Sequence, residues 1–149
     1  MCSSDLFDNF DAKEILQMIE KYKITTFCAP PTVYRVMVHM KLDKYDLSSL
    51  QNVTTAGEAL NPEIYEKFKA KTGFTIMEGF GQTETTLLIG NLVGDTPRPG
   101  SMGKPTPHYD VKVMLPDGTL AEPEEEGEIV IRTEEGVRSE EHTSELQSR

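Results

Sequence analysis

The chain has 149 residues, of which 37% are hydrophobic and 27% charged, and its formal net charge at pH 7 is -10. An acidic chain repels nucleic-acid phosphates and anionic membrane surfaces, so we expect no nucleic-acid partner. No apolar run approaches the roughly 18 residues of a membrane span and no secretion signal is visible, so we expect a cytoplasmic location. Two cysteines and three histidines are too few for a disulfide framework or a Cys/His zinc centre.

The two ends differ in character from the rest of the chain. Residues 138–149 (RSEEHTSELQSR) are charged and rich in Ser and Thr without apolar periodicity, as is typical of a solvated tail. The segment also resembles the in-frame translation of a short-read sequencing adapter, and MCSSDL at 1–6 resembles the translation of its opposite strand. We therefore expect 1–6 and 138–149 to be adapter-like artefacts around an insert of 7–137, and we leave them out of fold reasoning.

Helical and strand patterns alternate in the first part of the insert. Helices are predicted over 11–22, 31–41 and 61–72, and strands over 24–29, 52–57 and 74–79. Asp11 and Asn61 are suited to cap the first and third helices, and Gly73 is suited to end the third. The strand over 24–29 lacks polar alternation, so we expect it to be covered on both faces and Cys28 to be an inert core thiol. This order predicts an α/β unit with parallel strands.

The pattern changes near residue 94. Residues 94–108 are rich in Gly and Pro, which indicates a linker loop between an α/β part, 7–93, and an all-β part, 109–137. Strands with apolar alternation are predicted over 109–115 and 127–133. The Pro-Asp-Gly turn at 116–118 makes an antiparallel arrangement of these strands the expected one.

The segment EGFGQTETT, 78–86, carries the most chemistry. It follows a predicted strand, at the end where open α/β sheets bind ligands. We expect Gly79 and Gly81 to let the backbone turn sharply and expose N–H groups. The Thr83 hydroxyl is suited to phosphate oxygens, and the Glu84 carboxylate is suited to Mg²⁺.

A second segment, TAGEAL at 55–60, ends the preceding predicted strand, so both segments are placed to line one crevice. Taken alone, each segment is also typical of a structural glycine turn. For 78–86 that alternative includes a helix capped by Thr83 or Thr85, and it stays open at this point.

Four blocks in order resemble the adenylate-forming superfamily, and among its members the AMP-forming acyl-CoA synthetases of the acetyl and medium-chain type. They are TTFCAPPTVYR, TTAGEALNPEIYEKF, MEGFGQTET and PGSMGKPTPHYDVKV. The resemblance implies that 7–93 is a fragment of the family's second α/β subdomain and that 109–137 begins its antiparallel β-barrel subdomain. It also implies that a carboxylic acid and ATP form an acyl-adenylate, from which coenzyme A takes the acyl group.

The resemblance implies roles for individual residues. Those implied to bind ATP or AMP are Gly57, Glu58, Ala59, Glu78, Gly79, Phe80, Gly81, Gln82 and Thr83. Those implied to wall the acyl pocket are Ala29, Tyr34, Ala56 and Gly79. Thr83, as the phosphate-binding residue, and Glu84, as the Mg²⁺ ligand, are the implied catalytic pair. Phe80 stands where an aromatic side chain stacks on the base, and Ala59 replaces the usual proline. The alternatives are a non-catalytic nucleotide-binding module and a truncated reading frame without a function of its own.

Overall fold

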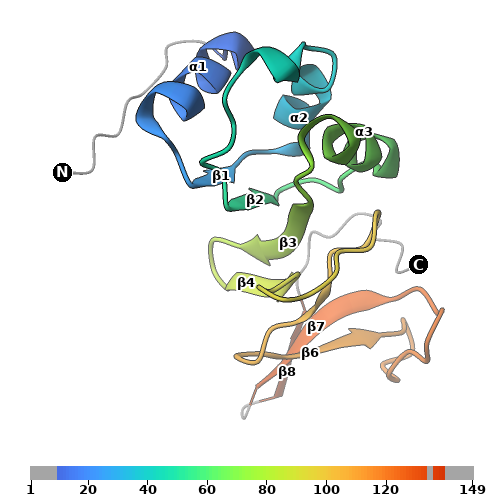
Figure 1. Ribbon diagram of the computed structural model, residues 1–149. Coiled ribbons are helices and arrows are strands. Elements are labelled where there is room, and N and C mark those ends of the chain that lie inside the picture. Colours follow the sequence, from blue (N-terminus) through green and yellow to red (C-terminus); the bar gives the residue numbers. More distant parts are fainter. Residues whose placement is uncertain (1–9, 134–135, 140–149) are drawn as a thin grey trace.

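The structure, a computed structural model, describes residues 10–133 and 136–139. The helical elements are α1 (Ala12–Tyr22), α2 (Pro31–Met37), the 3-10 helix η1 (Leu42–Lys44) and α3 (Pro62–Thr72). The strands are β1 (Thr26–Cys28), β2 (Asn52–Thr55), β3 (Ile76–Gln82), β4 (Thr86–Gly90), β5 (Lys104–Pro105), β6 (Asp110–Met114), β7 (Glu128–Thr133) and β8 (Gly136–Ser139). They form a five-stranded sheet in the order β1-β2-β3-β4-β5 and a three-stranded sheet in the order β6-β7-β8 (Figure 1).

The predicted α/β unit is confirmed. Strand β2 pairs in parallel with both β1 and β3, with Thr26 opposite Asn52 and Val53 opposite Ile76. Strands β1 and β2 are shorter than predicted, and β3 starts and ends later than its prediction. Helix α2 ends at Met37, and a 3-10 turn follows it.

The helix boundaries follow from local signals in the sequence. The Asp11 carboxylate accepts a hydrogen bond from the Lys13 amide at 2.8 Å, and the Asn61 side chain accepts one from the Glu63 amide at 2.8 Å. Gly73 ends α3 with φ of 79°, a left-handed conformation that suits glycine. Each cap satisfies a main-chain group that the helix itself leaves without a partner.

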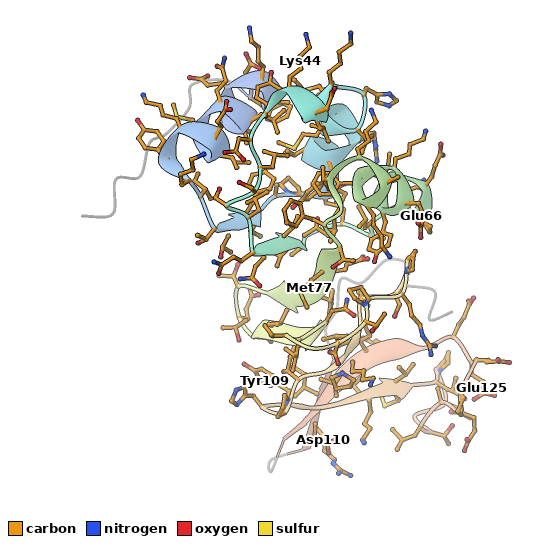
Figure 2. The ribbon with its side chains drawn as sticks, in the orientation of Figure 1. Lys44, Glu66, Met77, Tyr109, Asp110 and Glu125 are labelled. Atoms are coloured by element: carbon orange, nitrogen blue, oxygen red, sulfur yellow. The ribbon has the colours of Figure 1, made fainter. Side chains whose placement is uncertain are left out.

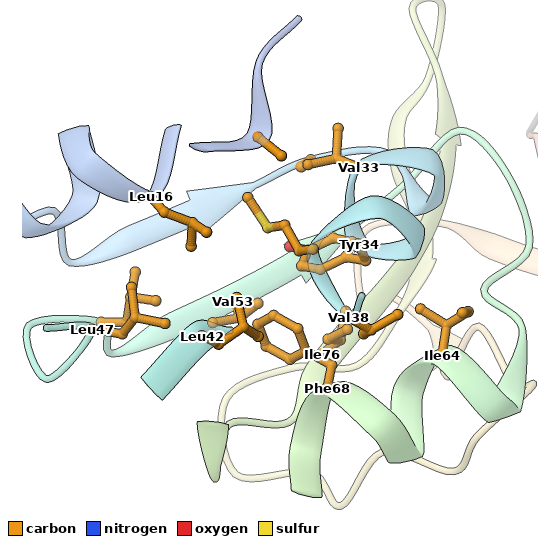
Figure 3. Close-up of a cluster of buried hydrophobic side chains, with 14 of the residues drawn as sticks. Leu16, Val33, Tyr34, Val38, Leu42, Leu47, Val53, Ile64, Phe68 and Ile76 are labelled. Carbon is orange, nitrogen blue, oxygen red and sulfur yellow. The ribbon is translucent and has the colours of Figure 1, made fainter. Parts of the chain in front are cut away.

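The larger apolar core lies between the helices and one face of β1–β3 (Figure 3). Tyr34 of α2 is fully buried there, with its ring edge-on to Phe68 of α3 at 5.3 Å. The Tyr34 hydroxyl donates a hydrogen bond to the Thr54 carbonyl oxygen at 2.7 Å, which ties α2 to the sheet.

The expectation that the first strand is covered on both faces is wrong. Thr26 and Cys28 are exposed, and only Phe27 between them is partly buried against the core. The strand order is sequential and parallel crossovers are right-handed, so α2 and α3 lie on the same side of the sheet. Within the described residues the opposite face of β1 has no helix over it, and Cys28 is therefore a surface thiol.

The chain after β3 forms a hairpin that the sequence pattern did not indicate. Strand β4 pairs antiparallel with β3, and β5, inside the predicted linker 94–108, pairs antiparallel with β4. The first sheet is therefore mixed and continues beyond residue 93. The division into subdomains at 93, 108 and 137 stays a prediction.

The predicted antiparallel strands of the all-β part are confirmed as β6 and β7, with Val111 opposite Ile131. The Pro116–Gly118 turn follows β6, and Gly118 has φ of 84°. The next strand, β8, includes Arg138 and Ser139, so the expected artefact boundary at 138 falls inside a strand. Residues 1–6 and 140–149 lie outside the described residues. Among the helices that are described, none has the length and apolar character needed to cross a membrane.

Candidate functional site

The two segments singled out in the sequence lie at neighbouring positions of the first sheet. The 56–60 loop follows β2, and Thr55 at the end of β2 is opposite Glu78 of β3. The main-chain N–H of Leu60 donates a hydrogen bond to Oε1 of Glu78 at 3.0 Å. The carboxyl ends of adjacent parallel strands meet at one edge, which explains why segments 18 residues apart are in contact here.

The 56–59 loop is open to solvent. Ala56, Gly57, Glu58 and Ala59 are all exposed. Gly57 has φ of 91°, and an added Cβ would meet nothing within 4 Å. The glycine is thus required by the backbone conformation and not by a neighbouring group.

Glu78 of β3 anchors this loop through the hydrogen bond to the Leu60 N–H. Its side chain is buried, with 6% exposed, and burial raises the pKa of its carboxyl group, an effect that the Leu60 N–H opposes. The Glu78 carbonyl oxygen accepts hydrogen bonds from the amide and the side-chain Nδ2 of Asn91, at 3.1 and 3.0 Å. Glu78 therefore connects β3, the 56–60 loop and the segment after β4.

Gly79 and Gly81 do not form the sharp turn that was expected. Both lie within β3, and neither has a positive φ. A Cβ on Gly81 would lie 1.7 Å from the Thr86 carbonyl oxygen, and one on Gly79 would lie 2.7 Å from Cδ1 of Leu87. The missing side chains let β4 approach β3 closely, next to an irregularity in the pairing between Phe80 and Gly81.

Thr83 and Glu84 lie in the turn of the β3–β4 hairpin, and both are exposed. The chain continues into β4, so the alternative of a helix cap at this point is wrong. The turn is closed by the Thr85 hydroxyl oxygen, which accepts a hydrogen bond from the Gln82 amide at 3.1 Å. The hairpin presents a hydroxyl and a carboxylate side by side in sequence, with neither held by the core.

Phe80 lies partly buried against a second apolar cluster formed by Leu88, Val111, Ile129 and Ile131. This cluster joins the two sheets, so the Phe80 side chain contributes to packing as well as being a candidate for stacking on a base. The stacking role stays a prediction.

The residues implied to wall an acyl pocket differ in burial, since Ala29 and Tyr34 are buried and Ala56 is exposed. The Ala29 amide donates to the Thr54 carbonyl oxygen at 3.2 Å, and the Ala29 carbonyl oxygen accepts from the Thr55 hydroxyl at 2.8 Å. Tyr34 faces the helix-side core, where burial raises the pKa of its phenol well above the usual range. Ala56 is exposed, and Gly79 lies within β3. The geometry therefore gives Tyr34 a core role and leaves the acyl pocket a prediction.

A hollow of about 820 Å³ lies between the two sheets, and both segments that were expected to line a crevice contribute to it. Its lining includes Ala59 and Glu78, together with Met102, Lys112 and Glu125. The rest of the lining comes from strands and loops that are distant in sequence, so no local motif indicated that part of the hollow.

Tyr109 is a further residue that sequence reasoning missed. Its hydroxyl donates a hydrogen bond to the Thr85 carbonyl oxygen, and it lies 3.3 Å from the Thr86 hydroxyl. A residue that directly precedes β6 thus holds the turn that carries Thr83 and Glu84. Its separation of 24 residues from Thr85 explains why no local signal could have identified it.

Within the described residues, no group of three or more His, Cys, Asp and Glu side chains is arranged to hold a metal ion. Mg²⁺ often takes only one or two carboxylates and completes its coordination with water and substrate phosphates. An exposed carboxylate beside a hydroxyl, as at Glu84 and Thr83, fits that kind of site.

Comparison with known proteins places the chain in a family. The family model described as AMP-binding enzyme matches residues 1–138. Over 123 residues the chain is 45% identical to the mitochondrial acyl-coenzyme A synthetase ACSM3 of Rattus norvegicus, covering 83% of this chain and 21% of that protein. Over 124 residues it is 44% identical to the uncharacterized acyl-CoA ligase YtcI of Bacillus subtilis, covering 82% of this chain and 23% of that protein.

Solved structures agree with this placement. The anthranilate CoA ligase AuaEII in complex with anthranoyl-AMP matches with a TM-score of 0.76 and 35% identity, over 84% of this chain and 24% of that chain. ATP-bound MatB from Rhodopseudomonas palustris matches with a TM-score of 0.77 over 89% of this chain and 26% of that chain, but at 20% identity it shows the fold alone. The chain spans about a fifth of the length of the curated relatives it matches. It belongs to the AMP-binding enzyme family, as its resemblance to adenylate-forming enzymes predicted.

Proposed function

We propose that this chain is part of an AMP-forming acyl-CoA synthetase. The observation that carries the proposal is the exposed hairpin turn with Thr83 and Glu84, which directly follows β3, the strand that also anchors the 56–60 loop. The matching proteins support the same reaction class, the joining of an acid to coenzyme A. They include an acyl-coenzyme A synthetase, an acyl-CoA ligase and an anthranilate CoA ligase.

The proposed reaction has two steps. A carboxylate oxygen of the acid attacks the α-phosphorus of ATP, and the bond from that phosphorus to pyrophosphate breaks, which gives an acyl-adenylate. The thiol of coenzyme A, on losing its proton, then attacks the acyl carbon, and the bond from that carbon to AMP breaks. The thioester and AMP are the products.

The hairpin would act on the first step. The Thr83 hydroxyl would donate to an oxygen of the α-phosphate as negative charge develops there, and the Glu84 carboxylate would hold Mg²⁺. When bound, the metal supplies positive charge against the phosphates. Because the turn is solvent-exposed and held by main-chain pairing on both sides, its side chains are free to meet a nucleotide without displacing core residues.

The remaining residues would bind the base. The open loop of Gly57, Glu58 and Ala59 would lie against the adenine, and Phe80 would offer its ring for stacking. Gly79, Gly81 and Gln82 would follow the nucleotide along β3.

ATP–pyrophosphate exchange tests this proposal in the full-length protein that contains the chain. Glu84→Gln keeps the side-chain size but removes the charge that would hold Mg²⁺. We expect kcat to fall by about 100-fold or more, with little change in the KM for the acid. Glu66→Gln is the matched control, because Glu66 is an exposed carboxylate on α3, away from the turn (Figure 2). Near-normal exchange by Glu84→Gln would remove Glu84 from the mechanism.

Two further measurements separate binding from catalysis. Phe80→Leu keeps apolar bulk in the second cluster but removes the flat face, so we expect mainly a raised KM for ATP. Saturable AMP binding by a wild-type protein that shows no exchange with a panel of carboxylic acids would favour a non-catalytic nucleotide-binding module.

A further inference from the structure

Tyr109 joins the two sheets of the molecule. It lies directly before β6, and its ring packs, partly buried, against the cluster of Leu88, Val111, Ile129 and Ile131. In Figure 2 its side chain lies between β4 and the second sheet. The ring is thus held by the apolar cluster, and its hydroxyl is directed to the hairpin.

The Tyr109 hydroxyl contacts Thr85 and Thr86, the two residues that directly follow the proposed catalytic pair. It donates to the carbonyl oxygen of Thr85, and with its hydrogen directed there, its oxygen can accept from the Thr86 hydroxyl at 3.3 Å. The turn therefore has two kinds of support. One is internal, from the Gln82 amide to the Thr85 hydroxyl oxygen, and the other comes from Tyr109, which precedes the second sheet.

The backbone of the hairpin needs such support. Thr86 has φ of 63°, a left-handed conformation that is unfavourable for a β-branched residue. Gly81 faces it so closely that a Cβ on Gly81 would lie only 1.7 Å from the Thr86 carbonyl oxygen. Strained backbone of this kind persists only where surrounding contacts hold it, and it is found most often at functional sites.

From these contacts we propose that Tyr109 is a positioning residue, whose hydroxyl fixes the turn so that Thr83 and Glu84 meet the nucleotide in one geometry. The inference rests on the proposed function for its effect on catalysis. Its structural part, that the hydroxyl orders the turn, can be tested without any activity.

Tyr109→Phe is the informative variant, because it keeps the ring in the cluster and removes only the hydroxyl. In the full-length protein we expect kcat for ATP–pyrophosphate exchange to fall about 3- to 10-fold, which corresponds to one neutral hydrogen bond. The KM for the carboxylic acid should stay within about 2-fold, while the Mg²⁺ concentration for half-maximal rate rises. Tyr22→Phe, an exposed tyrosine on α1, is the matched control and should change neither value.

A double-mutant cycle with Glu84→Gln separates positioning from general stability. If Tyr109 acts through the turn, its hydroxyl should matter little once Glu84 has lost its charge, so Tyr109→Phe should cost less than about 2-fold in that background. An equal loss in both backgrounds, accompanied by a lower melting temperature, would show a purely structural role and overturn the proposal.

Amide hydrogen exchange provides the readout that is independent of activity. The Thr85 amide donates to the Gln82 carbonyl oxygen at 3.2 Å, so its exchange rate reports on order in the turn. We expect faster exchange at Thr85 in Tyr109→Phe than in the wild type or Tyr22→Phe. Unchanged exchange would overturn the inference, whereas a wild type with an ordered turn but no pyrophosphate exchange would overturn only the proposed function.

Discussion

The two regions of the molecule hold their candidate ligand-binding segments by different means. In the region up to β3, seventeen buried apolar residues form one cluster between the helices and the sheet, and the 56–60 loop is attached to it. In the region after β3, the cluster has four buried residues, and the strands are held mainly by main-chain pairing. The Thr83–Glu84 turn belongs to this second region.

The difference shows which contacts control each segment. Side-chain packing in a large cluster distributes the stabilisation over many residues. A hairpin with few buried side chains depends instead on close backbone approach and on single hydrogen bonds, here those of Gly81, Thr85 and Tyr109. Substitutions in the first region should therefore change mainly global stability, and those in the hairpin mainly the geometry of the site.

The largest effect is expected from Phe68→Ala. Phe68 is 2% exposed and lies edge-on to Tyr34, so its truncation leaves a cavity in the large cluster. We expect a loss of about 3–5 kcal/mol in the free energy of unfolding, measured by urea titration. Leu88→Ala in the small cluster should cost less, about 2 kcal/mol. An equal or greater cost for Leu88→Ala would contradict the contrast between the two clusters.

Two glycine substitutions sharpen the comparison. Gly81→Ala places a Cβ against the main chain of Thr86, so the hairpin must open, at a cost of about 3 kcal/mol and with loss of exchange activity. Gly57→Ala meets no neighbour and pays only for its left-handed φ, about 1–2 kcal/mol. Melting curves and exchange rates measured together would test this, and a Gly81→Ala variant of wild-type stability would show that the strands are not in close contact.

A smaller effect is expected from removing one side-chain acceptor in each region. Asn61→Ala removes the cap of α3 and should cost about 1 kcal/mol, while Asn61→Asp should be nearly neutral. Thr85→Ala removes the acceptor for the Gln82 amide and should cost a similar amount, about 0.5–1.5 kcal/mol. Only Thr85→Ala should lower kcat, because only Thr85 belongs to the turn. A comparable fall in kcat for Asn61→Ala would show that the two regions are not independent.

The smallest change in stability is expected from Glu78→Gln, at the junction of the two regions, and it depends on pH. Burial raises the pKa of the Glu78 carboxyl group, so the folded state binds this proton more tightly than the unfolded state. Its contribution to stability is therefore full below the unfolded pKa of about 4.3 and is lost as the pH rises through the raised folded value.

Glu78→Gln removes this titration and keeps an oxygen that can accept the Leu60 N–H. The variant should show a flatter dependence of stability on pH above about 4.3, measured as midpoints of urea unfolding across a pH series. If wild type and variant have parallel pH profiles, the Glu78 carboxyl does not titrate with a raised pKa.

Several features were predictable because their causes lie within a few residues. The caps at Asp11 and Asn61 and the stop at Gly73 need only neighbouring main-chain groups, and all three are present. The alternation of helices and strands predicted the parallel pairing of β1, β2 and β3, since sequential βαβ units leave few other arrangements. The placement of 55–60 and Glu78 at one edge followed from the same rule.

Other features depended on contacts between distant parts of the chain. The exposure of Cys28 depends on which face of β1 the helices cover, and the role of Gly79 and Gly81 depends on how closely β4 approaches. The hydrogen bond from the Leu60 N–H to the Glu78 carboxylate and the one from the Tyr109 hydroxyl to the Thr85 carbonyl oxygen join residues 18 and 24 positions apart. Periodicity and capping act over one or two turns of chain, so the sequence alone determined the helices, the strands β1–β3, β6 and β7, and the candidate residues, but not β4 or β5. Only the tertiary structure decided which faces are open and what holds the Thr83–Glu84 turn in place.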